Sequence, residues 1–362
     1  MTTRKQRLWA ALDEIGASAF VACRWPNQLY LLDHPDPSSV ISRGNCHAIL
    51  FAPQQTVVFP GVWISNACRD LLGGCEVVTN DLGDPAPEQQ LALRLQREGY
   101  RKVVCDQAGG ALAALLAQTA AGLEVVADDV VTRLRRTKDD RDLAAMREAA
   151  RVADLGMVAA FRAIRPGVRC ADVIAEGVAT MLRAGAEYAD MRPASGEGTC
   201  YLDSAEDPRR VIRAGDMVFL DMIIHVHGYL GDMTRAGIVG EGTRQQRELL
   251  STVQQAYALA TGMMRPGAKA AGIYQAVVDH YAAGGLERYW VHHLSHGLGL
   301  GGDLPRIAHG SEDVLQAGDA LSCEPGLYVP GVGGARVENM LHITPAGVEE
   351  LTRCPLEPPM GS

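Results

Sequence analysis

The sequence predicts an α+β protein in which a duplicated C-terminal domain follows a smaller N-terminal α/β domain. The duplication is visible in an Ala-Gly-Asp triplet at residues 214–216 and 317–319. Each triplet is followed, after four residues of an apolar strand, by an acid, Asp221 or Glu324. Upstream of both copies, short β-branched runs alternate with helical stretches, which is typical of an α/β layer domain.

The N-terminal domain is expected over residues 1–132, and the duplicated domain over 133–362, because 362 residues suffice for two domains. In the N-terminal domain we expect strands at 19–23, 48–51, 56–59, 76–79, 102–105 and 124–127. Helices are expected there at 4–15, 87–98 and 110–120. This domain lacks a Gly-rich phosphate loop, so its predicted role is architectural.

A long, polar-faced helix that begins near Lys138 marks the start of the duplicated domain. An Arg-Pro-Gly triplet occurs once in each copy, at 165–167 and 265–267. Pro-Gly after a helix is a stop signal, so each triplet is expected to join two helices. The pattern predicts helices at 139–164, 171–185, 243–264 and 270–283, with strands ending at Asp221 and around 290–296 and 320–328.

Composition limits the classes of partner and the compartment. A formal charge of -9 argues against nucleic acid and anionic membrane, since both need a basic surface. The nine cysteines show no CxxC or zinc-finger spacing, which indicates reduced thiols rather than a disulfide framework. Neither a signal peptide nor an apolar run of about 18 residues occurs. We expect a cytoplasmic protein.

The first acid pair belongs to an apolar segment, residues 217–236, that turns at His227-Gly228. If the hairpin folds about position 226.5, Asp221 faces Asp232. Facing residues of antiparallel strands have Cβ atoms about 4.5–5.5 Å apart. Two carboxylates this close repel each other unless a cation lies between them.

The second copy repeats the arrangement around a Gly-rich turn at 330–334. A hairpin centred on Gly331 places Glu324 opposite Glu338. Cys323 is next to Glu324, so its side chain points to the other face of the strand and is expected to be a core thiol. Salt-bridged acids are the alternative interpretation, but only Arg235 and Arg336 are near in sequence.

An imidazole completes the candidate metal site. His292 and His296 are four residues apart and share one face in a helix or a strand. Four carboxylates and one histidine would be neutralised by two divalent ions. Oxygen-rich sites with one histidine suit Mn²⁺, which we expect first, or Co²⁺, Fe²⁺ and Zn²⁺.

These residues resemble the pita-bread superfamily, which includes methionine aminopeptidase, Xaa-Pro aminopeptidase, prolidase and creatinase. The similarity lies in the order Asp221, Asp232, His296, Glu324 in a Glu-Pro-Gly-x-Tyr segment, and Glu338 in Arg-x-Glu. The segments HHLSHGLGL and CEPGLYVPGVGGARVENM are most similar to the proline-specific branch. The resemblance implies a pita-bread catalytic domain, a creatinase-like N-terminal domain and a homodimer.

The resemblance also implies roles for individual residues. The metal ligands would be Asp221, Asp232, His296, Glu324 and Glu338. Glu324 would also shuttle the proton of a metal-bridging water, and His292 would contact the substrate. Arg336 lies two residues before Glu338, on the same strand face, and is expected to orient Glu338 or its neighbours.

Two histidines that are usual in the peptidase members have no counterpart. One would precede the first metal aspartate, where this chain has Asp203 and Ser204, and the other would follow His296, where it has residues 301–305. Asp303 in the latter stretch is either an acid/base or cation-binding group, or a loop residue before proline. The loss of such donors weakens oxyanion stabilisation, where one donor is typically worth about 3 kcal/mol.

We therefore expect a dinuclear-metal hydrolase of the Xaa-Pro dipeptidase or aminopeptidase type, acting on short peptides. An alternative is a non-peptidase reaction on a small metabolite, such as amidohydrolysis or β-elimination, because one fold hosts several chemistries. A catalytically inactive interaction module is a third alternative, against which the intact set of ligands argues.

Overall fold

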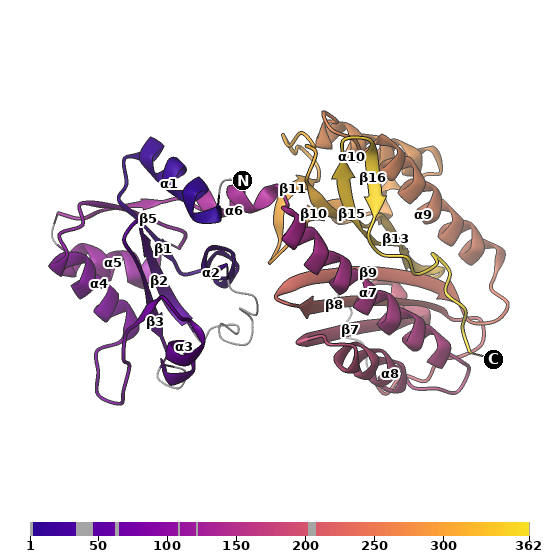
Figure 1. The fold of residues 1–362 in the computed structure, drawn as a ribbon. Coiled ribbons are helices and arrows are strands. Elements are labelled where there is room, and N and C mark those ends of the chain that lie inside the picture. Colours follow the sequence, from indigo (N-terminus) through magenta and orange to yellow (C-terminus); the bar gives the residue numbers. More distant parts are fainter. Residues whose placement is uncertain are drawn as a thin grey trace. The chain divides into compact units, whose positions relative to one another are not determined.

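The computed structural model describes residues 3–33, 46–61, 65–107, 109–120, 122–201 and 208–361. The chain forms two compact units, Met1–Arg135 and Arg136–Ser362 (Figure 1). The division falls between residues 135 and 136, where the sequence analysis expected it between 132 and 133.

A six-stranded mixed sheet with the order β4-β3-β2-β1-β5-β6 forms the centre of the first unit. Its strands are β1 (Ala19–Ala22), β2 (Cys46–Ala52), β3 (Gln55–Pro60), β4 (Glu76–Val77), β5 (Lys102–Cys105) and β6 (Glu124–Ala127). The helices of this part of the chain are α1 (Arg4–Ile15), α2 (Trp25–Leu32), α3 (Ser65–Leu71), α4 (Pro87–Arg97), α5 (Gly110–Thr119) and α6 (Val130–Arg136). Helix α2 packs on β1 and β2, and α4 packs on β2 and β3.

Each strand and helix predicted for this domain is present. Helices α2, α3 and α6 were not predicted. They are only eight, seven and seven residues long. Helices this short are marginal by themselves and depend on packing against the rest of the fold, which local sequence does not report.

The second unit contains two copies of a helix pair followed by strands, as predicted, although the strand expected around 290–296 is limited to residues 295–297. The first copy comprises α7 (Asp140–Ala163), α8 (Cys170–Arg183), β7 (Tyr188–Ser195), η1 (Gly196–Cys200), β8 (Met217–Val226) and β9 (Tyr229–Ile238). The helices of the second copy are α9 (Arg244–Met263), α10 (Ala270–Ala283) and η2 (Glu287–Tyr289). Its strands are β10 (Ser295–Gly297), β11 (Asp303–Ile307), β12 (Ala320–Cys323), β13 (Gly326–Val329), β14 (Gly333–Arg336), β15 (Asn339–Thr344) and β16 (Gly347–Glu350).

Equivalent backbone hydrogen bonds show the internal symmetry of the two copies. The amides of Gly167 and Gly267, which end the two Arg-Pro-Gly triplets, donate to Ile212 and Leu315 over 2.9 and 2.8 Å. Gly215 and Gly318 of the Ala-Gly-Asp triplets likewise donate to Val239, the residue after β9, and to Ile343 of β15, over 2.7 and 2.8 Å. The duplication read from the sequence is therefore a structural duplication, and the α+β class is confirmed.

Helices cover the strands of each copy and leave the acids on the other side. In the first copy α7 packs on β8 and β9, and α8 packs on β7 (Figure 1). Gly177 of α8 lies so close to β7 that a Cβ atom there would lie 2.5 Å from the methyl carbon of Met191. Cys323 is fully buried in the core of the second copy, as predicted for a thiol on the face opposite Glu324.

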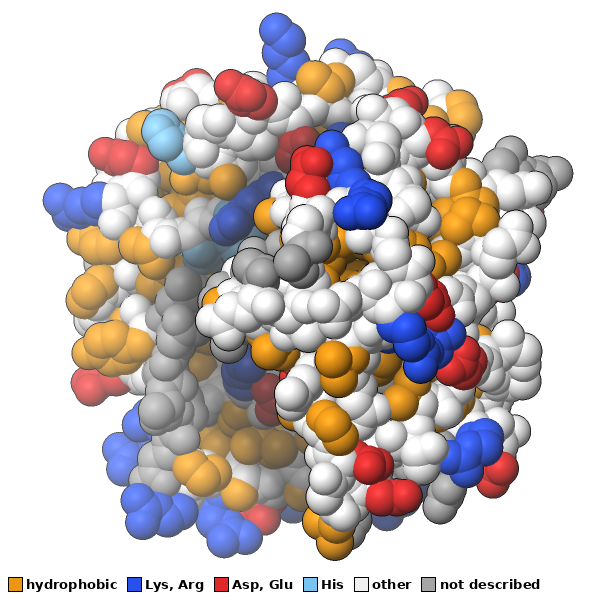
Figure 2. All heavy atoms as spheres, turned by 90° about the vertical axis from the view of Figure 1, so that its left-hand side faces the viewer, with side chains coloured by type: hydrophobic (Ala, Val, Ile, Leu, Met, Phe, Trp, Pro, Cys, Tyr) orange, Lys and Arg blue, Asp and Glu red, His pale blue; other side chains and the backbone are white. Residues whose placement is uncertain are grey.

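The surface carries both signs of charge. On the face drawn in Figure 2, acidic and basic side chains are scattered among hydrophobic and uncharged ones. Within the described residues, no helix is both long enough and apolar enough to span a bilayer.

Candidate metal centre

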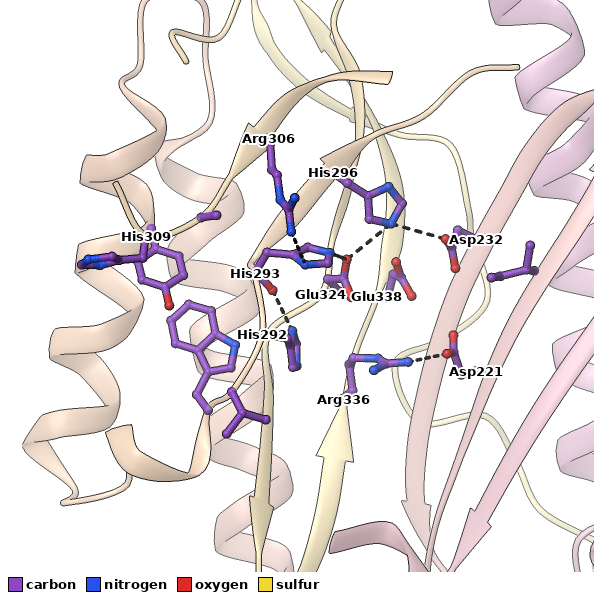
Figure 3. Close-up of a pocket in the computed structure, with 15 residues that line it drawn as sticks. Asp221, Asp232, His292, His293, His296, Arg306, His309, Glu324, Arg336 and Glu338 are labelled. Carbon is purple, nitrogen blue, oxygen red and sulfur yellow. Dashed lines mark hydrogen bonds and ion pairs between the residues drawn. The ribbon is translucent and has the colours of Figure 1, made fainter. Parts of the chain in front are cut away.

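A pocket of about 750 Å³ in the C-terminal unit collects acids from both copies and histidines from the second copy (Figure 3). All five predicted ligands line this pocket: Asp221, Asp232, His296, Glu324 and Glu338. His292 and Arg336, the other two residues predicted for its surroundings, line it as well. The structure thus brings seven residues predicted from separate motifs into one site.

The first hairpin has a different register from the one predicted. Asp221 on β8 pairs with Thr234 on β9, and Asp232 pairs with Ile223. The turn consists of His227 and Gly228, both at positive φ, as a type I′ hairpin turn requires, so the hairpin is centred one residue later than expected. Direct opposition of Asp221 and Asp232 was therefore wrong. Because the partner shifts by two positions, both acids still lie on the same face of the sheet.

The second hairpin has the predicted register. Leu327 pairs with Ala335 about a turn centred on Gly331, and Cys323 pairs with Asn339 in the same register farther out. Glu324 and Glu338 occupy the interruption between these two ladders and lie opposite each other. Thr234 has the position in the first copy that Glu338 has in the second. The Thr234 hydroxyl lies 2.8 Å from Glu338 Oε2.

His296 presents one ring nitrogen to the acids. Its Nε2 lies 3.5 Å from Asp232 Oδ2 and 3.5 Å from Glu324 Oε1. Its Nδ1 donates to the carbonyl oxygen of Gly297 over 3.2 Å. When the imidazole is neutral, a donor at Nδ1 leaves the lone pair on Nε2, which is the form that a metal ligand needs.

The acids are strongly coupled because they are buried together. Burial, then the charges of Asp232, Glu324 and Asp221, raise the pKa of Glu338 well above its usual value. Burial raises the pKa of Asp232 to about 6, although His296 opposes this shift. Burial would also raise the pKa of Glu324, but His293, His296 and Arg336 together lower it to about 2. Burial lowers the pKa of His296, but Asp232 and Glu324 outweigh it and raise the pKa to about 9.

This donor set fits divalent cations. Ligand atoms of Asp232, His296 and Glu338 lie within 4.8 Å of one another, and so do those of His293, His296 and Glu324. Carboxylate oxygens with imidazole nitrogen are typical ligands of Mn²⁺, Fe²⁺, Co²⁺ and Zn²⁺. Buried carboxylates that repel each other, as Glu338 and its neighbours do, are stabilised by such a charge.

Arg336 holds the acids of the two copies in place. Its Nη2 lies 2.6 Å from Asp221 Oδ2, and its Nε donates to Thr234 Oγ1 over 3.1 Å. The Thr234 hydroxyl lies within hydrogen-bonding distance of both Asp221 (3.0 Å) and Glu338 (2.8 Å). Arg336 therefore contacts Asp221 directly and reaches Glu338 through Thr234.

Both ring nitrogens of His292 are already engaged. Nδ1 donates to the carbonyl oxygen of His293 over 2.7 Å, and Nε2 lies 3.1 Å from the hydroxyl of Tyr328. The same Tyr328 hydroxyl accepts from Arg336 Nη1 over 3.2 Å, so its own proton points to His292. Burial, followed by the charge of Arg336, lowers the pKa of His292 to about 4. His292 lines the pocket as an uncharged ring.

Asp303 does not line the pocket, and its carboxylate forms an ion pair with Lys138 over 3.0 Å. Both side chains are 1% exposed. A buried carboxylate paired in this way is a structural group, so the acid/base role that we considered for Asp303 is not supported by its position. Asp203 and Ser204 lie outside the described residues.

The site residues that sequence reasoning missed include Thr234, His293 and Arg306. His293 Nε2 lies 3.0 Å from Glu324 Oε1, and Arg306 Nη2 lies 3.3 Å from His293 Nδ1 (Figure 3). His293 adjoins the predicted His292, and Thr234 follows Asp232 at the spacing of one strand face, so both had a local signal. Arg306 had none, because only the β10–β11 pairing places it opposite His296.

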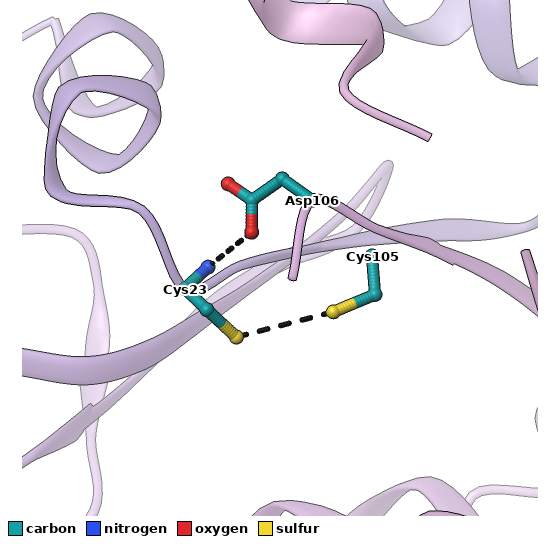
Figure 4. A group of neighbouring side chains, drawn as sticks. All are labelled: Cys23, Cys105 and Asp106. Carbon is teal, nitrogen blue, oxygen red and sulfur yellow. Dashed lines mark hydrogen bonds between the residues drawn. The ribbon is translucent and has the colours of Figure 1, made fainter. Parts of the chain in front are cut away.

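A second cluster of possible ligands lies in the N-terminal unit (Figure 4). The Sγ atoms of Cys23 and Cys105 are 3.9 Å apart, next to Asp106. The Asp106 carboxylate already accepts hydrogen bonds from the amides of Cys23 and Arg24 and from the Asn27 side chain. We assign no metal to this cluster, because its carboxylate holds the loop after β1.

The pita-bread fold and the convergence of the five predicted ligand residues in one pocket define a candidate metal site. Residues 144–345 match the metallopeptidase family M24, and the chain belongs to this family. It is 33% identical over 232 residues, 62% of this chain, to the Xaa-Pro dipeptidase of Pyrococcus furiosus. It is 34% identical over 250 residues, 67% of this chain, to a probable dipeptidase PepE of Mycobacterium tuberculosis. These alignments span 66% and 65% of the two relatives' lengths.

Solved structures extend the similarity over the whole chain. The Xaa-Pro dipeptidase from Bacillus anthracis superposes with a TM-score of 0.86 at 25% identity, covering 99% of both chains. The X-Pro aminopeptidase from Thermotoga maritima superposes with a TM-score of 0.85, covering 99% of this chain and 100% of its own, and at 21% identity supports the fold alone.

Proposed function

We propose that this protein is a metal-dependent peptidase that cleaves Xaa-Pro dipeptides or short peptides with proline in the second position. The observation that carries the proposal is the convergence of Asp221, Asp232, His296, Glu324 and Glu338 in one pocket. The similarity to a named Xaa-Pro dipeptidase supports the substrate class.

The five ligands would hold two divalent ions, with Mn²⁺ the first candidate. Such a metal pair, when bound, lowers the pKa of a water molecule and polarises a carbonyl oxygen. Glu324 accepts a proton from the attacking water and returns it to the leaving nitrogen. The hydroxyl of Ser322 lies 3.1 Å from Glu324 Oε1 and helps to hold this carboxylate.

The shape and polarity of the pocket favour a small substrate. Its volume of about 750 Å³ is within the usual range of small-molecule sites, about 300–1,000 Å³. One wall is aromatic: Trp290 stacks on Tyr274 with ring centroids 4.6 Å apart, which suits the apolar ring of a prolyl residue. The guanidinium of Arg306, an exposed residue that lines the pocket, would bind the C-terminal carboxylate of a dipeptide.

The proposal is tested by loading the purified protein with Mn²⁺ and measuring both metal content and hydrolysis of Ala-Pro, Ala-Pro-Ala and Pro-Ala. We expect about two ions per chain and cleavage of the first two peptides only. Asp221→Asn should lose metal and activity, whereas Asp279→Asn, at an exposed position on α10, should retain both. Bound metal without cleavage of any peptide would favour the non-peptidase alternative. A protein that binds no metal would contradict both enzymatic readings.

We further propose a cytoplasmic homodimer. All nine cysteines are free thiols, which supports a reducing compartment, and the dimer is inferred from the superfamily resemblance. Light scattering on the purified protein would return the mass of two 38.7 kDa chains, and a monomer mass would contradict the dimer.

A further inference from the structure

The pocket contains a second imidazole next to that of His296. The ring centroids of His293 and His296 are 5.5 Å apart, and both present Nε2 to Glu324 Oε1, over 3.0 and 3.5 Å. By distance alone, either ring could be a metal ligand. Their hydrogen bonds, however, indicate different tautomers.

Arg306 determines the tautomer of His293. The Arg306 Nη2 atom lies 3.3 Å from His293 Nδ1. A guanidinium has only donors, so Nδ1 must accept, and the neutral ring carries its proton on Nε2. His296 is the reverse case, because its Nδ1 donates to a carbonyl oxygen and leaves the lone pair on Nε2.

The Nε2–H group of His293 has no good partner in the described structure. The atom is shielded from solvent and, although it lies 3.0 Å from Glu324 Oε1, it forms no hydrogen bond of normal geometry with a described residue. A buried donor left in this state is unfavourable, because it has lost its hydrogen bonds to water without a full replacement. A substrate oxygen bound beside Glu324 would satisfy it.

We propose that His293, with its tautomer set by Arg306, donates Nε2–H to the substrate carbonyl oxygen as negative charge develops there during peptide cleavage. This inference rests on the proposed function. A metal-ligand role would require the proton on Nδ1, where it would face the donating Arg306. His292 cannot take the part, since both of its ring nitrogens are engaged.

A donor at His293 would replace one that the sequence lacks. No histidine follows His296 where the peptidases usually have one, and Asp303 in that segment is paired with Lys138 instead. His293 supplies an imidazole N–H from the other side of the metal ligand. One such donor is typically worth about 10²–10³ in kcat.

The tautomer is measured by imidazole ¹⁵N NMR on the Zn²⁺-loaded protein, with His293 assigned by its absence in His293→Gln. We expect Nε2 protonated and Nδ1 unprotonated in His293. Metal content is measured on His293→Ala and His296→Ala, and we expect only the latter to lose metal. An unprotonated Nε2, or metal loss in His293→Ala equal to that in His296→Ala, would make His293 a ligand and overturn the proposal.

Kinetic measurements provide the second part of the test. His293→Ala should lower kcat for Ala-Pro by about 10²–10³ with little change in KM, and His293→Gln, whose amide places a donor near the Nε2 position, should recover part of the loss. His227→Asn, at an exposed turn, should match the wild type. An unchanged kcat in His293→Ala would refute the donor role. Wild-type protein that cleaves no peptide would instead refute the proposed function, while the nitrogen shifts and metal content still assign the tautomer.

Discussion

The buried ion pair between Lys138 and Asp303 gives the sharpest test of whether Asp303 is a structural or a catalytic residue. Its Nζ–Oδ2 distance is 3.0 Å, and both side chains are 1% exposed. Removing one partner of such a pair leaves an uncompensated buried charge, which costs about 3–5 kcal/mol. For a domain of about 150–250 residues this lowers Tm by roughly 6–20 °C, at about 2–4 °C per kcal/mol.

The test is a double-mutant cycle of Lys138→Met, Asp303→Asn and the double variant, followed by urea unfolding and tryptophan fluorescence. Each single variant should lose about 3–5 kcal/mol of unfolding free energy. The double variant should lose less than the sum, because no buried charge remains. Arg244→Met, which breaks an exposed pair with Glu248, should leave Tm unchanged.

Activity decides between a structural and a catalytic Asp303. Assayed below its unfolding transition, Asp303→Asn should keep kcat within a few-fold of wild type. Wild-type stability combined with a kcat reduced by three orders of magnitude would refute the structural assignment and restore the acid/base role.

Three further predictions concern the metal centre. Glu338→Gln should raise the Tm of the metal-free protein at pH 8, because it removes a carboxyl whose pKa is raised by burial and by neighbouring acids. The same variant should show no gain in Tm when Mn²⁺ is added. A lower Tm of the metal-free variant would contradict the repulsion between the buried acids. The folded-state pKa is raised in both Asp232, to about 6, and His296, to about 9. The contribution of each group to the stability of the metal-free protein is therefore lost as the pH rises through its folded-state pKa. Because the ligands must be deprotonated, stabilisation by Mn²⁺ should grow between pH 5 and pH 8, and scanning calorimetry showing the opposite trend would rule this out. Thr234→Val removes the hydroxyl between Asp221 and Glu338. It should weaken Mn²⁺ binding by about 10–100-fold in calorimetric titration. Unchanged affinity would show that Arg336 alone is enough to hold the acids in place.

The features of the site that follow from the duplication or from the alternation of side chains along a strand were predictable from the sequence. A side-chain period of two placed Glu324 opposite Glu338 and Cys323 in the core, and the register about Gly331 was correct. The turn residues of the first hairpin, His227 and Gly228, were predicted correctly, but the hairpin was centred one residue too early, so its register was wrong. That error left the face of Asp232 unchanged, since the shift was two residues.

Contacts between elements that are distant along the chain could not be predicted in this way. Lys138 pairs with Asp303 across 165 residues, which turned a candidate catalytic acid into a structural one. Arg306 sets the tautomer of His293 only because β11 pairs with β10.

By itself, the sequence determined the duplicated α+β domain and the family resemblance, and it predicted the residues that meet in the pocket, because strand periodicity and turn signals are local. The tertiary structure decided which residue faces which across the site. It placed Thr234 opposite Asp221, Arg336 against both, and His293 as a donor beside His296. These relations depend on register and on the packing of the two copies against each other, and a linear pattern carries neither.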